Sequence, residues 1–232
     1  MNAATATAPL PKLRHGERLS RDEFHRRYEA MPDVKAELLD GVVYIMSSPV
    51  SRDHGHPHGF LMGWLFHYCA VTSGVESGDN VTTRLSERSE PQPDVYMCIQ
   101  ETHGGNSHID EDRYLSGAPE LLGEVARSSV GYDRTVKLPI YRQAGVREFI
   151  LWRVDDGAID WFVLRNGNYE ELVADANGIV RSETFPGLWL DVAAMLRRDA
   201  SAVLRVLQQG VSSPEHTAFV EQIRQTAEKI GS

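Results

Sequence analysis

Cysteine and long hydrophobic runs are scarce in this sequence. The two cysteines among 232 residues, Cys69 and Cys98, lie in apolar patterns, so we expect buried free thiols in a reducing compartment rather than a disulfide framework. No apolar stretch approaches the roughly 20 residues that a membrane-spanning helix needs. Residues 1–11 lack the basic start and apolar stretch of a secretory signal. We therefore expect a cytoplasmic protein with no membrane association.

Several common catalytic motifs are also absent, and positive charge is in short supply. The chain has no glycine-rich phosphate loop, nucleophile elbow or CxxC pair, which excludes simple nucleotide-binding, serine-hydrolase and thioredoxin-type functions. Its 24 Lys and Arg residues face 33 Asp and Glu residues, for a net charge of −9. A protein that coats polyanions must neutralise many phosphates, so this balance argues against one. It does not exclude a nuclease that has a local basic patch and a bound cation.

The composition is that of an ordinary globular protein. Hydrophobic residues make up 41% of the chain and charged residues 25%, and the length suits one domain of moderate size plus an appendage. We expect a disordered leader over residues 1–17, a main domain over 18–198 and a C-terminal helical extension over 199–232.

Hydrophobic periodicity predicts an α/β fold with a mixed central β-sheet flanked by helices. Ser20 to Glu23 form a capping box that begins a helix over 21–30, and Asp40-Gly41 predicts a hairpin between two short apolar runs. We expect further helices over 53–71, 133–144, 191–208 and 215–230. We expect further strands over 80–85, 94–99, 120–126, 148–154, 158–164 and 169–173.

Acidic residues interrupt or adjoin the apolar strands. Asp94 opens one strand, and Glu124 interrupts an apolar run of the kind that strands buried on both faces show. A buried charge is costly unless it is paired or binds a metal, and Mg²⁺ prefers oxygen ligands. Glu37 opens the hairpin and could complete such a site. Lys137 follows on a helix, where an ammonium group could stabilise negative charge that develops on a phosphate. The pattern indicates metal-assisted phosphodiester hydrolysis.

Each of these residues also has a simpler interpretation. Asp94 follows Pro93 and suits a turn, Glu124 could face solvent, and Glu37 could be an exposed strand residue. Lysine is usually exposed, which would also account for Lys137. The sequence leaves both interpretations open for Glu37.

Basic and aromatic residues near Lys137 could contact a substrate. Arg127, Arg134 and Arg142 lie close to it in sequence and predict a phosphate-facing patch in an acidic chain. Tyr141 is one helical turn after Lys137 and lies on the same helix face.

Three closely spaced histidines suggest a zinc site as an alternative. His54, His56 and His58 are spaced by two residues, which resembles the spacing in metal-hydrolase loops. The run enters a helix, however, where residues two apart point to different faces. His54 at the helix start could instead contact substrate or the acidic residues.

A series of short motifs, in order along the chain, resembles the Uma-type family of restriction endonucleases within the PD-(D/E)xK nuclease superfamily. The resemblance covers residues 18–196 and rests on eight segments taken together. They are Glu37 to Gly41, Met46 to Pro49 with His54, Gln92 to Val95, Tyr114 to Leu121, Glu124-Val125, Asp133 to Tyr141, Ala144 to Phe149, and Phe185 to Leu188.

The resemblance implies a restriction-endonuclease-like core and DNA phosphodiester hydrolysis that depends on Mg²⁺, with Mn²⁺ as a substitute. It implies that Glu37, Asp94 and Glu124 form the acidic, metal-binding site and that Lys137 is the catalytic lysine. The superfamily pattern would place a lysine at position 126, where this chain has Ala126, so Lys137 resembles a migrated replacement. We expect four residues to bind substrate: His54, Arg127, Arg134 and Tyr141.

Two other functions remain open. The chain could be a catalytically weak member of the same fold that binds nucleic acid or protein, or a zinc hydrolase that uses the histidine run. We expect a homodimer, because cutting both strands of a duplex favours two-fold symmetry.

Overall fold

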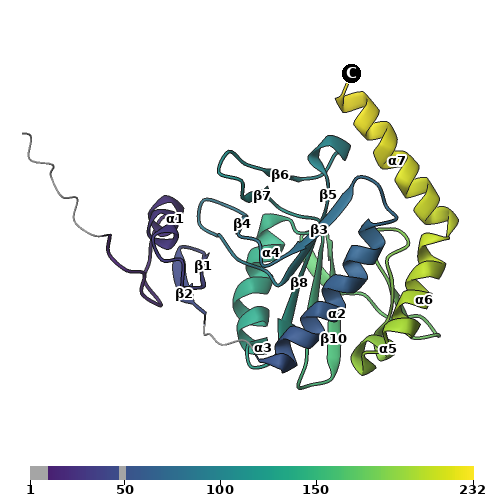
Figure 1. Cartoon of the computed structure of the whole chain (residues 1–232), viewed down its shortest axis with the longest axis horizontal. Helices are drawn as coiled ribbons and strands as arrows, with labels where there is room; N and C mark the ends of the chain where they lie inside the picture. The colour runs from purple at the N-terminus through teal and green to yellow at the C-terminus, as the bar shows by residue number, and fades with distance from the viewer. Residues whose placement is uncertain (1–9, 47–50) are drawn as a thin grey trace, which may run out of the picture.

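The computed structural model describes residues 10–46 and 51–232. Figure 1 shows two parts, a small N-terminal unit and a larger body built around a twisted sheet. The N-terminal unit, residues 10–46, contains α1 (Arg21–Glu29) and the antiparallel hairpin β1 (Ala36–Leu39) and β2 (Val42–Ile45). Its own apolar core is built from the following buried residues: Leu13, Phe24, Ala36, Leu38 and Val43.

Local sequence signals explain the N-terminal unit. The Ser20 side chain accepts a hydrogen bond from the Glu23 amide, which confirms the predicted helix start. Asp40 and Gly41 both have positive φ, as the predicted two-residue hairpin turn requires. Of the expected leader, residues 1–9 lie outside the described residues. Leu13 is buried, so the part of that segment that the structure describes packs against the hairpin.

The central sheet has six strands in the order β11-β10-β9-β8-β5-β3. Only the β8–β9 pair is parallel, and the other neighbours are antiparallel, so the sheet is mixed, as the sequence predicted. The bounds are β3 (Val75–Asp79), β5 (Val95–Ile99), β8 (Leu121–Ala126), β9 (Glu148–Arg153), β10 (Ala158–Arg165) and β11 (Asn168–Glu171). All six residues of β8 are buried, which matches its nearly continuous apolar sequence.

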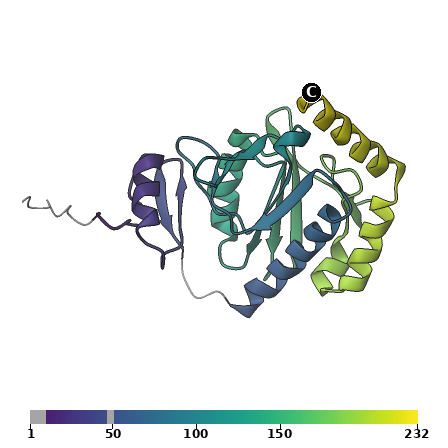
Figure 2. The same cartoon turned by 45° about the horizontal axis from the view of Figure 1, so that its top comes forward.

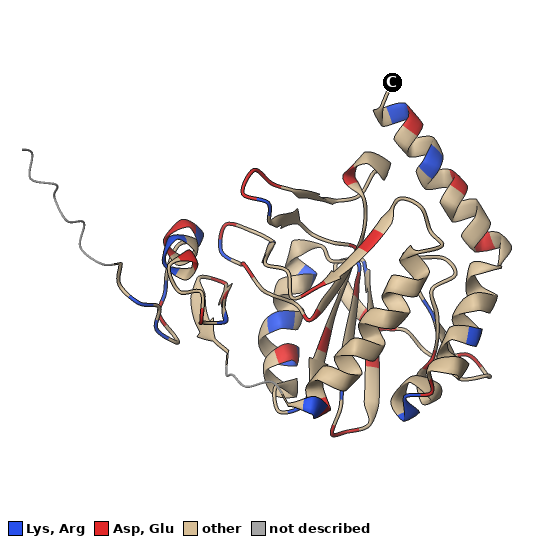
Figure 3. Cartoon of the chain, in the orientation of Figure 1, with Lys and Arg blue, Asp and Glu red and all other residues tan. Residues whose placement is uncertain are grey.

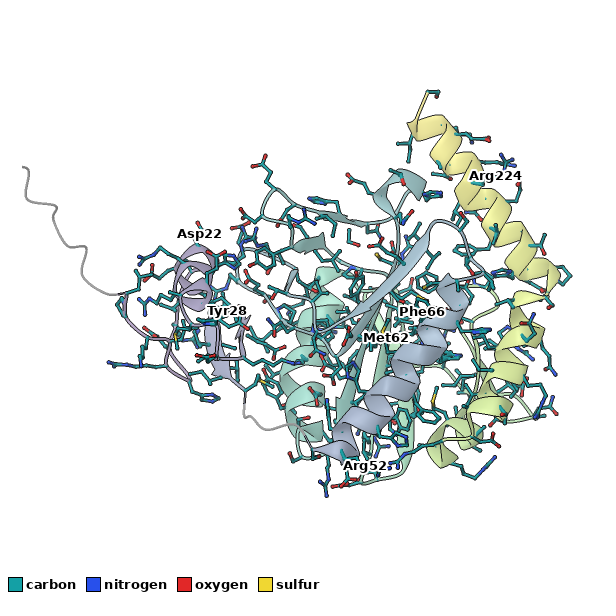
Figure 4. The ribbon with its side chains drawn as sticks, in the orientation of Figure 1. Asp22, Tyr28, Arg52, Met62, Phe66 and Arg224 are labelled. Carbon is teal, nitrogen blue, oxygen red and sulfur yellow. The ribbon has the colours of Figure 1, made fainter. Side chains whose placement is uncertain are left out.

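Helices cover both faces of this sheet (Figures 1 and 2). One face packs with α2 (Arg52–Cys69), α6 (Ala200–Val211) and α7 (Pro214–Ile230) in the larger core cluster. The other face packs with α4 (Leu138–Ala144), whose Tyr141 is fully buried. The outer side of α2 faces away from the sheet, and Phe66 on it is 63% exposed (Figure 4).

Smaller elements surround the sheet. They are β4 (Thr83–Arg84), η1 (Glu101–His103), β6 (Ser107–Ile109), β7 (Leu115–Gly117), α3 (Val130–Tyr132), η2 (Asp133–Lys137), β12 (Ile179–Arg181), β13 (Trp189–Asp191) and α5 (Val192–Arg197). The element η2 is a π turn that joins α3 to α4. In the part of the chain that the structure describes, no helix is long and apolar enough to cross a membrane.

Three predicted elements differ from the structure. The strand expected over 80–85 is replaced by β3, which ends at Asp79, and the two-residue β4, because Asn80 has a positive φ that ends the first strand. The helix expected over 191–208 is two helices, α5 and α6, separated at Arg198, whose φ is also positive. The helix expected over 133–144 begins with the π turn.

Candidate active site

Two of the predicted acids meet at the same end of the central sheet. Asp94 immediately precedes β5, Glu124 lies in β8, and Val95 pairs with Gly123, so the two strands are neighbours. Both carboxyl groups are buried. The Val125 amide donates a 2.8 Å hydrogen bond to Oδ2 of Asp94, which ties the first acid to the strand that carries the second.

Glu37 reaches the same place from the N-terminal unit. Its side chain is fully buried. Oε1 accepts a 2.7 Å hydrogen bond from the Gln92 amide, and Oε2 accepts a 3.2 Å hydrogen bond from the hydroxyl of Tyr132. The simpler interpretation of Glu37, an exposed strand residue, is therefore wrong.

Lys137 lies between two of the acids. Its Nζ is 3.0 Å from Oε1 of Glu37 and 2.9 Å from Oε1 of Glu124, and only 2% of the residue is exposed. The ring of Tyr132 lies below it, with its centroid 5.7 Å from Nζ. Lys137 is thus not the surface lysine that its residue type would suggest.

The charges in this cluster shift one another's pKa values. Burial raises the pKa of Glu124 to about 8, although the nearby Lys137 ammonium acts in the opposite direction. Burial also acts to lower the pKa of Lys137, but the adjacent Glu124 and Glu37 outweigh it and raise that pKa well above its ordinary value. The Lys137 side chain therefore stays charged at neutral pH.

Asp94 shows the opposite balance. Burial acts to raise its pKa, but hydrogen bonds from His54 and the Val125 amide outweigh burial, so the pKa of Asp94 lies below its ordinary value. Asp94 is therefore an anion at neutral pH, as a metal ligand must be.

A pocket of about 290 Å³ opens onto these residues. Asp94, Glu124 and Lys137 line it, and so does Asp133 of the π turn. Asp133 is buried, and it accepts a 2.8 Å hydrogen bond from the Ser129 hydroxyl. Burial raises the pKa of Asp133 to about 6. The pocket thus has more carboxyl groups than buried cations, even after Lys137 is counted.

The three histidines do not converge. His54 and His58 lie one turn apart on α2, with Nε2 of His54 3.5 Å from Oδ1 of Asp94 and Nε2 of His58 donating to the Asp94 carbonyl at 2.9 Å. His56 points elsewhere and packs edge-on against Phe60. The helical spacing therefore favours a role for His54 beside Asp94 over a three-histidine zinc site.

The predicted substrate-binding residues lie in different surroundings. Arg127 lines the pocket and pairs with Asp53 and Asp155. Arg134 instead pairs with Asp160 on β10. Tyr141 is fully buried and donates a 2.7 Å hydrogen bond to Glu124, so in this structure it supports that acid rather than facing the pocket.

The carboxyl groups of the pocket suit Mg²⁺ only in a water-rich mode of binding. Among residues 10–46 and 51–232, no three His, Cys, Asp or Glu side chains are grouped to hold a metal by themselves. Mg²⁺ does not need such a cage, because it keeps several waters and commonly takes one or two carboxylates. Asp94 and Glu124 supply two buried carboxylates in a pocket that opens to solvent, so the set fits this mode of binding.

Comparison with known proteins places the chain in a family. The model of the Uma2 family, described as "Putative restriction endonuclease", matches residues 21–193, which is well over half of the chain. The chain belongs to the Uma2 family. The matched region holds Glu37, Asp94, Glu124 and Lys137, and it ends before α6 and α7. The family resemblance expected from the sequence is confirmed, whereas the expected domain boundaries stay predictions.

A solved structure shares the Uma2 chain's fold. It is a protein from Anabaena variabilis described as a putative nuclease belonging to DUF820, with a TM-score of 0.58 and 14% sequence identity. The alignment covers 77% of this chain and 99% of that chain. This likeness supports the restriction-endonuclease-like fold predicted from the sequence. No curated protein matches the chain.

Sequence reasoning missed three residues of this Uma2 site. Gln92 contributes a backbone amide to Glu37, Tyr132 contributes a hydroxyl and a ring face, and Asp133 lines the pocket. Gln92 and Asp133 lay inside motifs that carried the resemblance, which was the one available signal. From the sequence we expected Asp133 only as the start of a helix.

Proposed function

We propose that this Uma2-family chain is a metal-dependent endonuclease that hydrolyses phosphodiester bonds in DNA. The observation that supports the proposal best is the cluster of buried carboxyl groups around Lys137, which opens into a pocket. Burial raises the pKa of Glu124 and Asp133 because their anionic forms are costly in this pocket, and a bound cation would offset that cost. A phosphodiester that approaches a bound cation would meet the lysine in the same pocket.

Asp94 and Glu124 would hold Mg²⁺, with Mn²⁺ as a substitute. The hydrogen bonds to Glu124 in the described structure fall on Oε1, and the Val125 amide bonds to Oδ2 of Asp94, so each carboxyl group would still have an oxygen to offer a cation. When bound, Mg²⁺ supplies a water of lowered pKa and polarises the phosphate. The backbone of Val125, which also lines the pocket, would complete the protein's contribution.

The remaining residues would stabilise the charge on the phosphate or hold the catalytic side chains in position. The Lys137 ammonium would offset the negative charge that develops on the phosphate, and burial strengthens that effect because little water screens it. Glu37 holds Lys137 in place through its 3.0 Å contact. His54 would keep Asp94 ionised and oriented.

Cleavage of plasmid DNA tests the proposal. Supercoiled and linear DNA would be incubated with the wild type, Asp94→Ala and Lys137→Ala in Mg²⁺, Mn²⁺ or EDTA. Glu171→Ala, at an exposed position on β11, is the matched control for loss of an acid. We expect cutting by the wild type and the control in Mg²⁺ or Mn²⁺, none in EDTA, and a loss of at least about 100-fold in both site variants.

The alternative functions predict other results. DNA that stays intact with a folded wild type, yet binds to it, would replace hydrolysis with the binding role of a catalytically weak member of the fold. Cutting supported by Zn²⁺ alone would favour the histidine run. Equal cutting by wild type and Asp94→Ala would reject the proposed acidic site.

A further inference from the structure

Lys35 lines the same pocket as Asp94 and Glu124. It is half-buried and immediately precedes β1, two residues before Glu37. Its carbonyl accepts a 2.8 Å hydrogen bond from the Met46 amide, which continues the hairpin ladder past the start of β1. Because residues two apart in extended chain point to the same side, Lys35 and Glu37 face the site together. Glu37 is covered, and Lys35 stands at the edge of the pocket.

The charge of Lys35 is not neutralised by a carboxylate within the described residues. Its Nζ donates a 2.8 Å hydrogen bond to the neutral side-chain oxygen of Asn80. The other strong cations that line the pocket are paired with acids: Lys137 with Glu37 and Glu124, and Arg127 with Asp53 and Asp155. Residues 1–9 and 47–50 contain no Asp or Glu, so they supply no acidic partner by composition.

Asn80 holds Lys35 close to the metal-binding end of the sheet. The backbone amide of Asn80 donates a 3.2 Å hydrogen bond to the backbone carbonyl of Asp94, and the side-chain oxygen of Asn80 accepts the hydrogen bond from Lys35. An ammonium group fixed in this way is a point charge of the kind that binds phosphate.

We propose that Lys35 binds a backbone phosphate of the nucleic acid next to the bond that is cut. This inference rests on the proposed function and extends it to the substrate: the N-terminal unit supplies both Glu37, which holds Lys137, and Lys35, which holds the polyanion. Lys35 acts before the chemical step. Its loss therefore weakens binding of DNA and leaves metal binding intact.

The salt dependence of DNA binding tests the role of Lys35. Binding of a short labelled DNA duplex would be measured by fluorescence anisotropy over a range of KCl concentrations, with Ca²⁺ in place of Mg²⁺ so that the DNA is preserved. For Lys35→Gln we expect the slope of log Kd against log salt to fall by about 0.9, since one phosphate contact is lost. Lys35→Arg should keep the wild-type slope.

Lys229→Gln is the matched control, because it makes the same change in net charge near the C-terminal end of α7, and Figure 1 shows that end far from α3 and the start of α2. Its slope should equal that of the wild type. Titration of each protein with Mn²⁺ alone, followed calorimetrically, should give the same affinity for wild type and Lys35→Gln.

The outcomes separate this inference from the proposed function. A wild type that binds neither Mn²⁺ nor DNA would reject the proposed nuclease site itself. A wild type that binds both, with an unchanged slope in Lys35→Gln or an equal change in Lys229→Gln, would reject the phosphate contact of Lys35 alone.

Discussion

At the scale of single residues, Lys137 links the stability of the fold to the chemistry of the site. It is buried between Glu37 and Glu124, and each contact is close enough for a charge-assisted hydrogen bond. Buried carboxylates depend on such a partner, because removal of one member of a buried ion pair leaves an uncompensated charge. The lysine that we propose to stabilise a phosphate is thus also the cation that offsets the charge of the buried acids.

Replacement of Lys137 by methionine should therefore destabilise the protein strongly. We expect Lys137→Met to lower the free energy of unfolding by about 3–5 kcal/mol, measured by urea denaturation at neutral pH. The control is Arg134→Met, which breaks an ion pair whose arginine side chain is 47% exposed and should cost no more than about 1 kcal/mol. Equal losses in the two variants would contradict the assigned role of Lys137.

Residues differ in how far the sequence could predict them. Glu124 could be recognised because a charge inside an apolar run needs a reason. The role of Gln92 could not, since it acts through a backbone amide that almost every residue has. Tyr132 was hidden because its contacts with Glu37 and Lys137 exist only after two distant segments pack together.

At the scale of elements, a buried polar contact docks the C-terminal helix. His216 of α7 donates from Nε2 to the hydroxyl oxygen of Thr72 at 2.9 Å, and Thr72 in turn donates to the carbonyl of Tyr68 on α2. Burial lowers the pKa of His216, because the charged imidazolium would lose contact with water. The interface therefore requires the neutral form of this histidine.

Acidification should weaken this interface. Below the unfolded-state pKa of about 6.5, the unfolded chain binds a proton that the folded chain does not, so the free energy of unfolding falls as the pH falls. Between about pH 6.5 and 5, we expect the wild type to lose more stability than His216→Gln, by up to about 1.4 kcal/mol per pH unit. Chemical denaturation at each pH measures the free energy of unfolding of both proteins. His108→Gln, at an exposed position, should follow the wild type, and parallel curves for wild type and His216→Gln would refute the idea.

The boundaries of the elements were predicted less well from the sequence than their existence and type. The strands and long helices with clear periodicity were predicted well, as the match between expected 120–126 and β8 shows. The break between α5 and α6 was missed because Arg198 adopts a left-handed conformation that its residue type rarely favours. The π turn of η2 was missed because π turns are rare and this one is too short to set a periodic pattern of its own.

At the scale of the whole molecule, the N-terminal unit and the sheet body have separate apolar cores. The unit packs around Phe24 and Leu38, whereas the body uses two other clusters on the faces of its sheet. Contacts between the two parts include polar ones, among them His25 with the buried Glu90 and Glu37 with Lys137. Figure 3 shows that charged residues are spread over both parts, including the central strands. Periodicity predicted the elements, but it could not show that the site lies where the two parts meet.

Separate cores predict separate loss of structure. Phe24→Ala should cost about 3–5 kcal/mol within the N-terminal unit, since Phe24 is fully buried there. Hydrogen exchange followed by mass spectrometry should then show faster exchange in β1 and β2, with β8 and β9 as protected as in the wild type. Uniform acceleration through both parts would mean that they open as one cooperative unit.

The meeting of these two parts also sets an order of events during synthesis. Glu37 leaves the ribosome long before Gln92, Tyr132 and Lys137, which become its partners. Domains form from the N-terminus as the chain grows, so the hairpin can close around its own core while Glu37 still lies in water. Contacts between residues so distant in the chain form late. The nascent protein therefore assembles this cluster of acids and lysine only after most of its sheet exists, and a chain cut short before Lys137 carries the acids without their counterion.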